Sequence, residues 1–257
     1  DQKFPVNDDM KEDAATIIKQ IKSAYKSNYG DNYKDSLNQA LTSAGYKNLS
    51  EYRQRMIKQI QYANFLLDYI DDHFDDVFND YYQQCAPKYV SLIKISVSDT
   101  SSPTDNETSK LNEVKELISN TDKSFGDIAQ DYSDDSTSSK KGSLGIVDSK
   151  DTSGIANSYG KDVFNAIEAL SEGQVSDVIT GDDGYYFVKV TSTDKKTLKK
   201  ELKKTDIDSP LLAYDDYLQY VVYNSYKINY KDKDIKKIVQ EVVNKALEER
   251  KTERGEA

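Results

Sequence analysis

Residues 178–190 read Val178-Ile-Thr-Gly-Asp-Asp-Gly-Tyr-Tyr-Phe-Val-Lys-Val190. The two outer pieces are rich in β-branched and aromatic residues, and Gly181-Asp-Asp-Gly184 between them has the composition of a turn. This stretch therefore predicts a strand, a turn and a second strand. Residues 89–97, Tyr-Val-Ser-Leu-Ile-Lys-Ile-Ser-Val, alternate apolar and polar side chains after Leu92 and predict another strand. Together they place a sheet in the middle of the chain.

The segments between these strands predict the rest of a small mixed domain. Residues 96–109 are rich in Ser and Thr and predict a loop. Helices are expected at about 110–119 and 125–132, a short strand at 144–147, and a helix at 162–170. The order strand, helix, helix, strand, helix, strand, strand mixes hairpin and crossover connections, which favours an α+β fold.

Glycine divides the chain into three zones. Residues 1–89 hold two of the 11 glycines, residues 90–195 hold eight, and residues 196–257 hold one. Because glycine gathers where turns are frequent, the flanking zones are expected to be helical. In the first zone, apolar spacing predicts helices at 17–25, 36–41 and 49–70, and a fourth that ends before Pro87. In the last zone, Ser209-Pro210 predicts a helix start, residues 228–230 a short extended piece, and residues 234–249 a final amphipathic helix.

Composition excludes several classes of protein. The 257 residues carry 35 Lys and Arg against 45 Asp and Glu, a net charge of −10 without a basic stripe, so nucleic acid is not an expected partner. No apolar run approaches the roughly 18 residues of a transmembrane helix. His73 and Cys85 are the single His and Cys, which argues against a zinc site, a Ser-His-Asp triad and an internal disulfide. Asp1 suggests a processed or trimmed chain.

Four motifs in the middle zone carry a family likeness. They are Phe125-Gly-Asp-Ile-Ala-Gln-Asp-Tyr-Ser-Asp-Asp135, Gly142-Ser-Leu-Gly145, residues 166–170 followed by Gly173-Gln-Val-Ser176, and Gly184-Tyr-Tyr-Phe-Val-Lys-Val190. In this order they resemble a parvulin-type peptidyl-prolyl isomerase domain over roughly residues 90–193. The flanks, with Tyr29-Gly-Asp, Glu51-Tyr-Arg and Pro87-Lys-Tyr-Val, are similar to the PrsA foldase lipoproteins of Gram-positive bacteria.

This resemblance implies an architecture. Residues 90–195 would be the parvulin-like domain, inserted between residues 1–89 and 196–257. Those two helical segments would pack together as one chaperone lobe, similar to the lobes of SurA and trigger factor. The implied partners are unfolded, newly exported polypeptides. The implied location is the outer face of the cell membrane, held by a lipid anchor on a Cys that would precede Asp1, and the resemblance leaves a homodimer open.

The resemblance also implies site residues. The family's two histidines fall on Lys94 and Tyr186, and its central Cys or Asp falls on Asp135. The apolar pocket for the proline ring would use Leu144, Tyr159 and Val163, with Phe164 as an alternative to Val163. Both histidine positions are therefore changed, while the central carboxylate is kept.

These changes predict weak or absent isomerase activity. Prolyl isomerisation needs no nucleophile, metal or cofactor, because the barrier of about 18–20 kcal/mol comes from amide resonance, so no cofactor is expected. Lys94 would form an ion pair with Asp135, and Tyr186, with a reference pKa of about 10, cannot relay a proton near neutral pH. Two plainer interpretations stay open: Lys94 and Tyr186 as ordinary strand residues, and Asp135 as a carboxylate that caps a turn.

A tyrosine repeat offers a second surface for substrate. Tyr214, Tyr217, Tyr220, Tyr223 and Tyr226 recur every third residue on the predicted helix after Ser209. Since each step of three falls about 60° short of a full turn, some rings would be buried and others, with Tyr214 and Tyr217 as candidates, would bind unfolded chain. Core packing is the alternative for most of them. The leading hypothesis is therefore an extracytoplasmic foldase, and the competing ones are an active prolyl isomerase and a non-catalytic surface interaction protein.

Overall fold

The computed structural model describes residues 4–202 and 209–256, which form two compact units. Unit 1 combines residues up to His73 with residues from Tyr217 onward, and unit 2 comprises residues 74–216. Each is described by itself. Asp1, before which the family resemblance places a lipid anchor, lies outside the described residues.

Unit 1 is helical. It contains α1 (Asp8–Tyr29), α2 (Tyr33–Ser43), α3 (Leu49–Asp72), α10 (Leu218–Ser225) and α11 (Lys233–Glu253). The first half of α3 packs on α1 through a cluster of buried apolar side chains: Met10, Ala14, Ile18, Met56, Ile57 and Ile60. The second half of α3 meets α10, where the Phe65 and Tyr223 ring centroids lie 5.9 Å apart. The two ends of the sequence thus contribute to one unit.

Local caps explain where the unit 1 helices begin. Asn48 Oδ1 accepts a hydrogen bond of 2.9 Å from the Glu51 amide and starts α3. The Glu51 carboxylate accepts from the amide of Lys47, one residue before the cap, rather than from the Asn48 amide as in a capping box. Asn7 caps α1 and Asp232 caps α11 in the same way.

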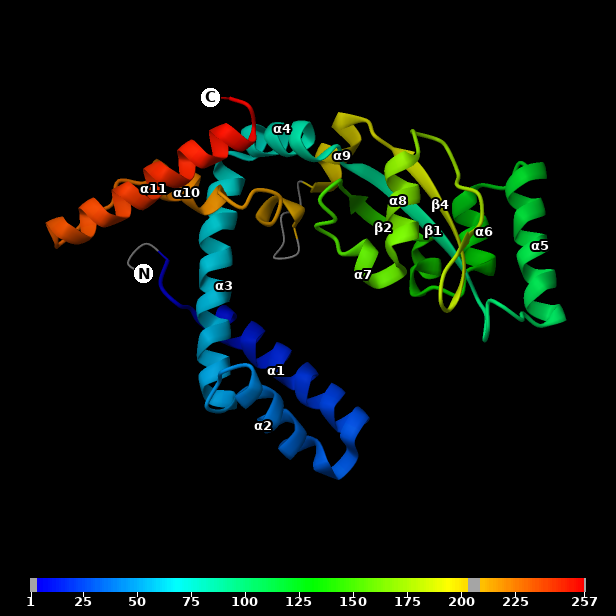
Figure 1. Ribbon diagram of the computed structural model, residues 1–257, viewed down its shortest axis with the longest axis horizontal. Coiled ribbons are helices and arrows are strands. Elements are labelled where there is room, and N and C mark those ends of the chain that lie inside the picture. The colour runs from blue at the N-terminus through cyan, green and yellow to red at the C-terminus, as the bar shows by residue number, and fades with distance from the viewer. Residues whose placement is uncertain (1–3, 203–208, 257) are drawn as a thin grey trace. The chain divides into compact units, whose positions relative to one another are not determined.

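Unit 2 is built on a four-stranded antiparallel sheet in the order β2-β1-β4-β3, of which Figure 1 labels β1, β2 and β4. Its strands are β1 (Lys88–Ser96), β2 (Ser143–Val147), β3 (Ile179–Thr180) and β4 (Gly184–Ser192). Its helices are α4 (Phe74–Cys85), α5 (Asp105–Asn120), α6 (Phe125–Tyr132), α7 (Ile155–Tyr159), α8 (Lys161–Ala169) and α9 (Lys195–Leu202), with 3₁₀ turns at Ser136–Lys140 and Pro210–Leu212. The predicted α+β class is confirmed.

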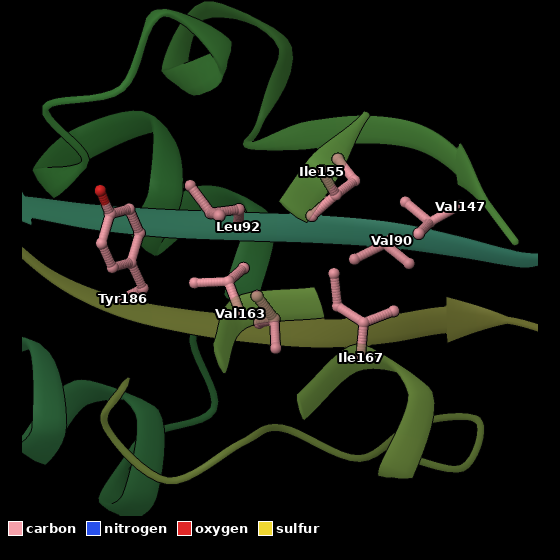
Figure 2. Close-up of a cluster of buried hydrophobic side chains, with 8 residues drawn as sticks. Val90, Leu92, Val147, Ile155, Val163, Ile167 and Tyr186 are labelled. Atoms are coloured by element: carbon pink, nitrogen blue, oxygen red, sulfur yellow. The ribbon is translucent and has the colours of Figure 1, made fainter. Parts of the chain in front are cut away.

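Alternation along the central strands supplies a core on each face of the sheet. Val90 and Leu92 of β1 point to one face, which α7 and α8 cover, and Ile93 and Ile95 point to the other, which α5 and α6 cover. Figure 2 shows the first of these clusters, with Tyr186 at one end and its hydroxyl turned away from the aliphatic side chains.

Several predicted elements differ from the observed ones. Helix α5 begins at Asp105, inside the expected loop, because Thr104 and Glu107 form a capping box. Helices α7 and α9 were not predicted. The tyrosine repeat does not lie on one helix, since a 3₁₀ turn at Pro210–Leu212 and the short α10 replace the helix expected from Ser209.

Unit 2 extends beyond the zone 90–195 at both ends. Tyr81 of α4 is fully buried and donates a 2.8 Å hydrogen bond to Asp148, which follows β2. Tyr214 packs edge-on against Tyr81, with ring centroids 5.4 Å apart, and donates to Asp80 at 2.8 Å. These contacts attach α4 and residues 209–216 to the sheet domain. The compositional boundaries at 90 and 195 could not register them, because the residues involved are tyrosine and aspartate rather than glycine.

Gly142 lies in close contact with β1 and α6, so substituting it would test how tightly these elements pack. Its φ is +74°, and a Cβ there would clash with the carbonyl oxygen of Leu92 and lie 2.8 Å from Ala129 Cβ. We expect Gly142→Ala to destabilise unit 2 by at least about 2 kcal/mol beyond the roughly 1–2 kcal/mol of backbone strain. Gly173→Ala is the control, because Gly173 has φ +84° with nothing within 4 Å. Urea denaturation followed by circular dichroism would measure both; equal losses would contradict this packing.

Candidate functional site

The pairing of β1 with β4 brings two predicted site residues side by side. Lys94 lies directly opposite Tyr186 in the antiparallel register, so both side chains leave the same face of the sheet. The Lys94 ammonium lies 5.6 Å from the centroid of the Tyr186 ring. The Tyr186 side chain is almost completely buried, and 17% of the Lys94 side chain is exposed. The site thus sits at the end of the apolar cluster in Figure 2.

Asp183, in the turn before β4, joins these two residues. Its carboxylate accepts hydrogen bonds from Lys94 Nζ through one oxygen and from the Tyr186 hydroxyl through the other. These two hydrogen bonds hold the pKa of Asp183 below its usual range, and the bond from Lys94 has the larger effect. Lys94 therefore pairs with Asp183, and the predicted ion pair with Asp135 is wrong. Because Asp183 immediately precedes β4, it is nearer to the end of the Lys94 side chain.

Asp135 caps a turn. Its Oδ1 accepts from the Thr137 amide at 2.8 Å and from the Thr137 hydroxyl at 2.6 Å, and it starts the 3₁₀ turn Ser136–Lys140. The Tyr159 hydroxyl approaches the same oxygen at 3.5 Å, the limit of a hydrogen bond. The capping interpretation of Asp135 therefore describes its geometry; it meets the predicted pocket through the Tyr159 hydroxyl, and its charge also helps to raise the pKa of Tyr186.

Two tyrosines connect the carboxylates. The rings of Tyr159 and Tyr186 pack edge to face with centroids 6.2 Å apart. Burial raises the pKa of both phenols, and the nearby carboxylates, Asp183 for Tyr186 and Asp135 for Tyr159, raise them further. Both hydroxyls are therefore protonated throughout the neutral range, and each donates its proton to a carboxylate.

A pocket of about 490 Å³ opens beside this pair. Three predicted site residues line it: Tyr159, Val163 and Tyr186. Val163 of α8 is only 1% exposed, so it forms part of the core at the base of the pocket. The lining also includes Ile179, Lys161 and the carboxylates of Asp162, Asp182 and Asp183. A pocket that combines a few apolar and aromatic side chains with polar and charged ones can hold an apolar ring with polar neighbours.

The other predicted substrate-binding residues lie elsewhere. Leu144 of β2 lines a different pocket of about 300 Å³, with Tyr89 and Pro210. Phe164 is half-buried against the apolar cluster and is absent from the lining of the Tyr186 pocket. Val163, rather than Phe164, is thus the member of that pair that reaches the pocket.

Tyr214 and Tyr217 do not form a substrate surface together. Tyr214 is 2% exposed in the core of unit 2, so its proposed contact with substrate is corrected to a packing role. The alternative of core packing is right for this ring, because Tyr81 and Asp80 satisfy both its face and its hydroxyl. Tyr217 belongs to unit 1, is half-buried and donates a 2.7 Å hydrogen bond to Glu253.

Sequence reasoning missed Asp183. Asp182 and Asp183 were expected to be turn residues, and they are. The position of Asp183 in this turn also places its carboxylate within hydrogen-bond distance of Lys94 and Tyr186. The turn delivers Asp183 to the start of β4, three residues before Tyr186, whose side chain is buried. A signal was available: once Lys94 is aligned opposite Tyr186, the nearest acidic residue in sequence to either is Asp183.

Comparison with known proteins identifies the domain. The rotamase family, described as the PPIC-type PPIase domain, matches residues 92–192. The chain is 31% identical over 159 residues to the foldase protein PrsA of Staphylococcus aureus strain MRSA252, covering 59% of this chain and 47% of the relative. It is 35% identical over 136 residues to the foldase protein PrsA of Staphylococcus epidermidis strain RP62A, covering 50% and 39%. The chain thus spans about half the length, or less, of these curated relatives.

Solved structures of similar proteins include PrsA from Bacillus subtilis and from Streptococcus pneumoniae. The first is 21% identical with a TM-score of 0.40, covering 91% of this chain and 81% of that chain. The second is 19% identical with a TM-score of 0.43, covering 90% and 81%. The middle of the present chain is a parvulin-type peptidyl-prolyl isomerase domain. Residues 92–192 match the parvulin-type domain family, and the curated relatives to which part of the chain is similar are PrsA foldases.

The Asp183 network predicts a pH-dependent contribution to stability. Because folding lowers the pKa of Asp183, its contribution is present above the unfolded pKa of about 3.9 and is lost as pH falls through the lower folded value. We expect Asp183→Asn to destabilise unit 2 at pH 7 by less than about 1 kcal/mol, since the Asp183 side chain is 65% exposed.

Urea midpoints measured from pH 7 to pH 2 would test this. The difference between the unaltered chain and Asp183→Asn should shrink below pH 4. Asp182→Asn, which changes the neighbouring exposed carboxylate, should have a smaller effect at pH 7. A difference that persists unchanged at pH 2 would show that the ion pair is not its source.

Proposed function

We propose that this protein is an extracytoplasmic foldase that binds unfolded, newly exported polypeptides, and that its parvulin-type domain has little or no prolyl isomerase activity. The observation that carries the second half is the network in which Lys94 and Tyr186 both donate to Asp183. The relation to PrsA foldases supports the first half.

The reaction explains why this network matters. An isomerase accelerates rotation by binding the twisted amide more tightly than either planar form. In parvulins, the two histidines would organise a hydrogen-bond network with the central Cys or Asp beneath the bond that twists. Side chains in such a network must be able to exchange partners as the amide rotates. Here Lys94 and Tyr186 occupy both histidine positions, and their protons are already engaged with Asp183.

The electrostatics of the site oppose proton relay. The raised pKa of Tyr186 leaves its phenol protonated at neutral pH, and Lys94 is held by a carboxylate whose pKa is lowered. Asp135, the remaining member of the set, is occupied with capping at Thr137. The pocket lined by Tyr159 and Val163 retains the means to bind a proline ring, so the domain can act as a clamp without accelerating isomerisation.

Unit 1 supplies the proposed chaperone surface. Large apolar side chains stay exposed on it, among them Tyr223, Ile235, Ile238 and Val242, at 40% to 60%. An exposed apolar patch on a protein often marks a site where another molecule binds. In the part of the chain that the structure describes, no helix is both long and apolar enough to cross a membrane. A lipid anchor ahead of Asp1 remains part of the proposal.

An isomerase assay tests the proposed loss of turnover. In a protease-coupled assay with a proline peptide, we expect the chain to be at least about 10²-fold less active than an active parvulin assayed alongside. Restoring both histidines with the double variant Lys94→His/Tyr186→His should raise activity about ten-fold or more, because imidazoles can exchange protons near pH 7.

The same assay separates the active-isomerase alternative. Asp135→Asn removes the charge of Asp135 but keeps an oxygen to cap the Ser136–Lys140 turn. Clear catalysis by the unaltered chain that falls in Asp135→Asn would favour a working isomerase and overturn the proposed loss. Circular dichroism would verify that each variant is folded.

A holdase assay tests the proposed chaperone role. We expect the chain, at a few-fold molar excess, to suppress light scattering when a chemically denatured enzyme is diluted into buffer. Tyr159→Ala, which removes one wall of the isomerase pocket, should suppress scattering to within two-fold of the unaltered chain. No suppression, together with tight binding to one defined partner, would instead support a surface interaction protein.

A further inference from the structure

Unit 1 carries a groove formed where α3, α10 and the segment that leads into α11 meet. Two adjoining hollows of about 640 and 280 Å³ share Tyr223, Tyr226, Lys227 and Ile228. We call their combined lining the α3–α10–α11 groove. All of its described lining residues belong to unit 1. The groove lies outside the parvulin-type domain and is independent of the Tyr186 pocket.

Aromatic rings form the floor of the groove. Phe65 of α3 lies at their centre, with ring centroids of Tyr223 at 5.9 Å, Tyr226 at 5.3 Å and Tyr62 at 6.4 Å. Burial, followed by the nearby phenols of Tyr223 and Tyr220, raises the pKa of Tyr62 to about 12. Yet Tyr62, Tyr223 and Ile228 are each 37% to 40% exposed. The floor is therefore apolar, partly dehydrated and accessible.

A second exposed apolar strip lies on α11. Ile235, Ile238 and Val242 are 50% to 60% exposed, and at about 100° per residue they fall within an arc of about 60°. The predicted apolar face of this helix is thus present, but of its larger residues only Val243 is buried. None of the three exposed side chains lines either hollow, so the strip is a separate exposed apolar surface on the same helix.

The charged side chains that line the groove are lysines, while the Asp68 carboxylate accepts a 3.4 Å hydrogen bond from the lining residue Tyr226. Among the residues that the structure describes, the lining of the groove contains Lys58, Lys227 and Lys236 and no carboxylate, although the chain has 45 acidic residues against 35 basic ones. The lysine ion pairs recorded on α11 involve Lys237, Lys245 and Lys251 instead. Side-chain amides of Asn224, Asn229, Gln240 and Asn244 lie along the edges and offer both donors and acceptors.

We propose that the α3–α10–α11 groove binds extended polypeptide segments whose apolar side chains are flanked by Asp or Glu. This inference rests on the proposed chaperone function and names its substrate class. The aromatic floor would bury the apolar side chains, the amides would bond the extended backbone, and Lys227 and Lys236 would attract the flanking carboxylates. A second copy is a poorer occupant, since a two-fold contact through this groove would place the same lysines against one another.

Matched peptides test the preference for acidic flanks. Three fluorescein-labelled peptides would share one apolar core and differ in having Asp, Ser or Lys on both sides. We expect the Asp-flanked peptide to bind the full chain at least ten-fold more tightly than the Lys-flanked one in 50 mM NaCl, by fluorescence anisotropy. Raising the salt to 500 mM should reduce this ratio, because the Debye length shortens.

Charge-reversal variants test whether Lys227 and Lys236 cause the preference for acidic flanks. Lys227→Glu/Lys236→Glu should bring the ratio to one or below, whereas Lys227→Arg/Lys236→Arg should retain it. The control Lys19→Glu/Lys22→Glu makes the same charge change on the exposed face of α1 and should leave the ratio within two-fold of the unaltered chain. Circular dichroism would verify folding of each variant.

The outcomes separate this inference from the proposed function. Suppression of client aggregation without an acidic preference, or an equal loss of preference in both reversal variants, would overturn the inference and leave the foldase proposal standing. Failure to suppress aggregation would overturn the foldase proposal itself. If sedimentation showed a dimer that Lys227→Glu/Lys236→Glu disrupts, the groove would be a self-association surface and the inference would be wrong.

Discussion

The antiparallel pairing of β1 with β4 is the constraint on which unit 2 depends. Side chains alternate strictly along a strand, so the register that sets Leu92 opposite Val188 also sends Ile93 and Phe187 to the other face. Both cores are assembled from this one pairing, and α5, α6, α7 and α8 only cover what it presents. A slip by one residue would exchange the two faces and bury Lys94 beneath a helix.

The same register creates the charged network at the end of the sheet. Once Lys94 faces a buried tyrosine, its ammonium needs a carboxylate within reach, because a desolvated charge without a partner is costly. Asp183 answers that need and also accepts the Tyr186 proton. In the resulting arrangement the ammonium and the phenol each donate to a different oxygen of the Asp183 carboxylate. In the proposed function, this pairing leaves the ammonium and the phenol little to offer a rotating amide.

Local patterns predicted most of the middle domain, and contacts distant in sequence account for what they missed. The strands around Leu92 and Tyr186 were predictable because β-branched and aromatic residues alternate between turn residues, and the helix Phe125–Tyr132 because its apolar face is regular. Helix α7 is five residues long, too short for periodicity to register. The Lys94–Asp183 pair spans 89 positions, and the burial of Tyr214 depends on Tyr81. Local spacing of residues contains neither relation. It did predict the apolar face of α11, but it did not predict that most of this face is exposed.

The hydrogen bond between Tyr214 and Asp80 joins residues 134 positions apart and lies wholly within unit 2. It fastens the segment by which the chain enters this unit to the segment by which it leaves. The entropic cost of closing a loop grows only with the logarithm of the loop's length. This hydrogen bond therefore closes a long insertion at little more entropic cost than a shorter one. A module whose entrance and exit are neighbours can replace a surface turn of a host fold without parting the host's own helices. This gives a physical reason why a helical unit can be interrupted after His73 and resumed at Tyr217. It also suggests how such a module can be inserted into different host proteins.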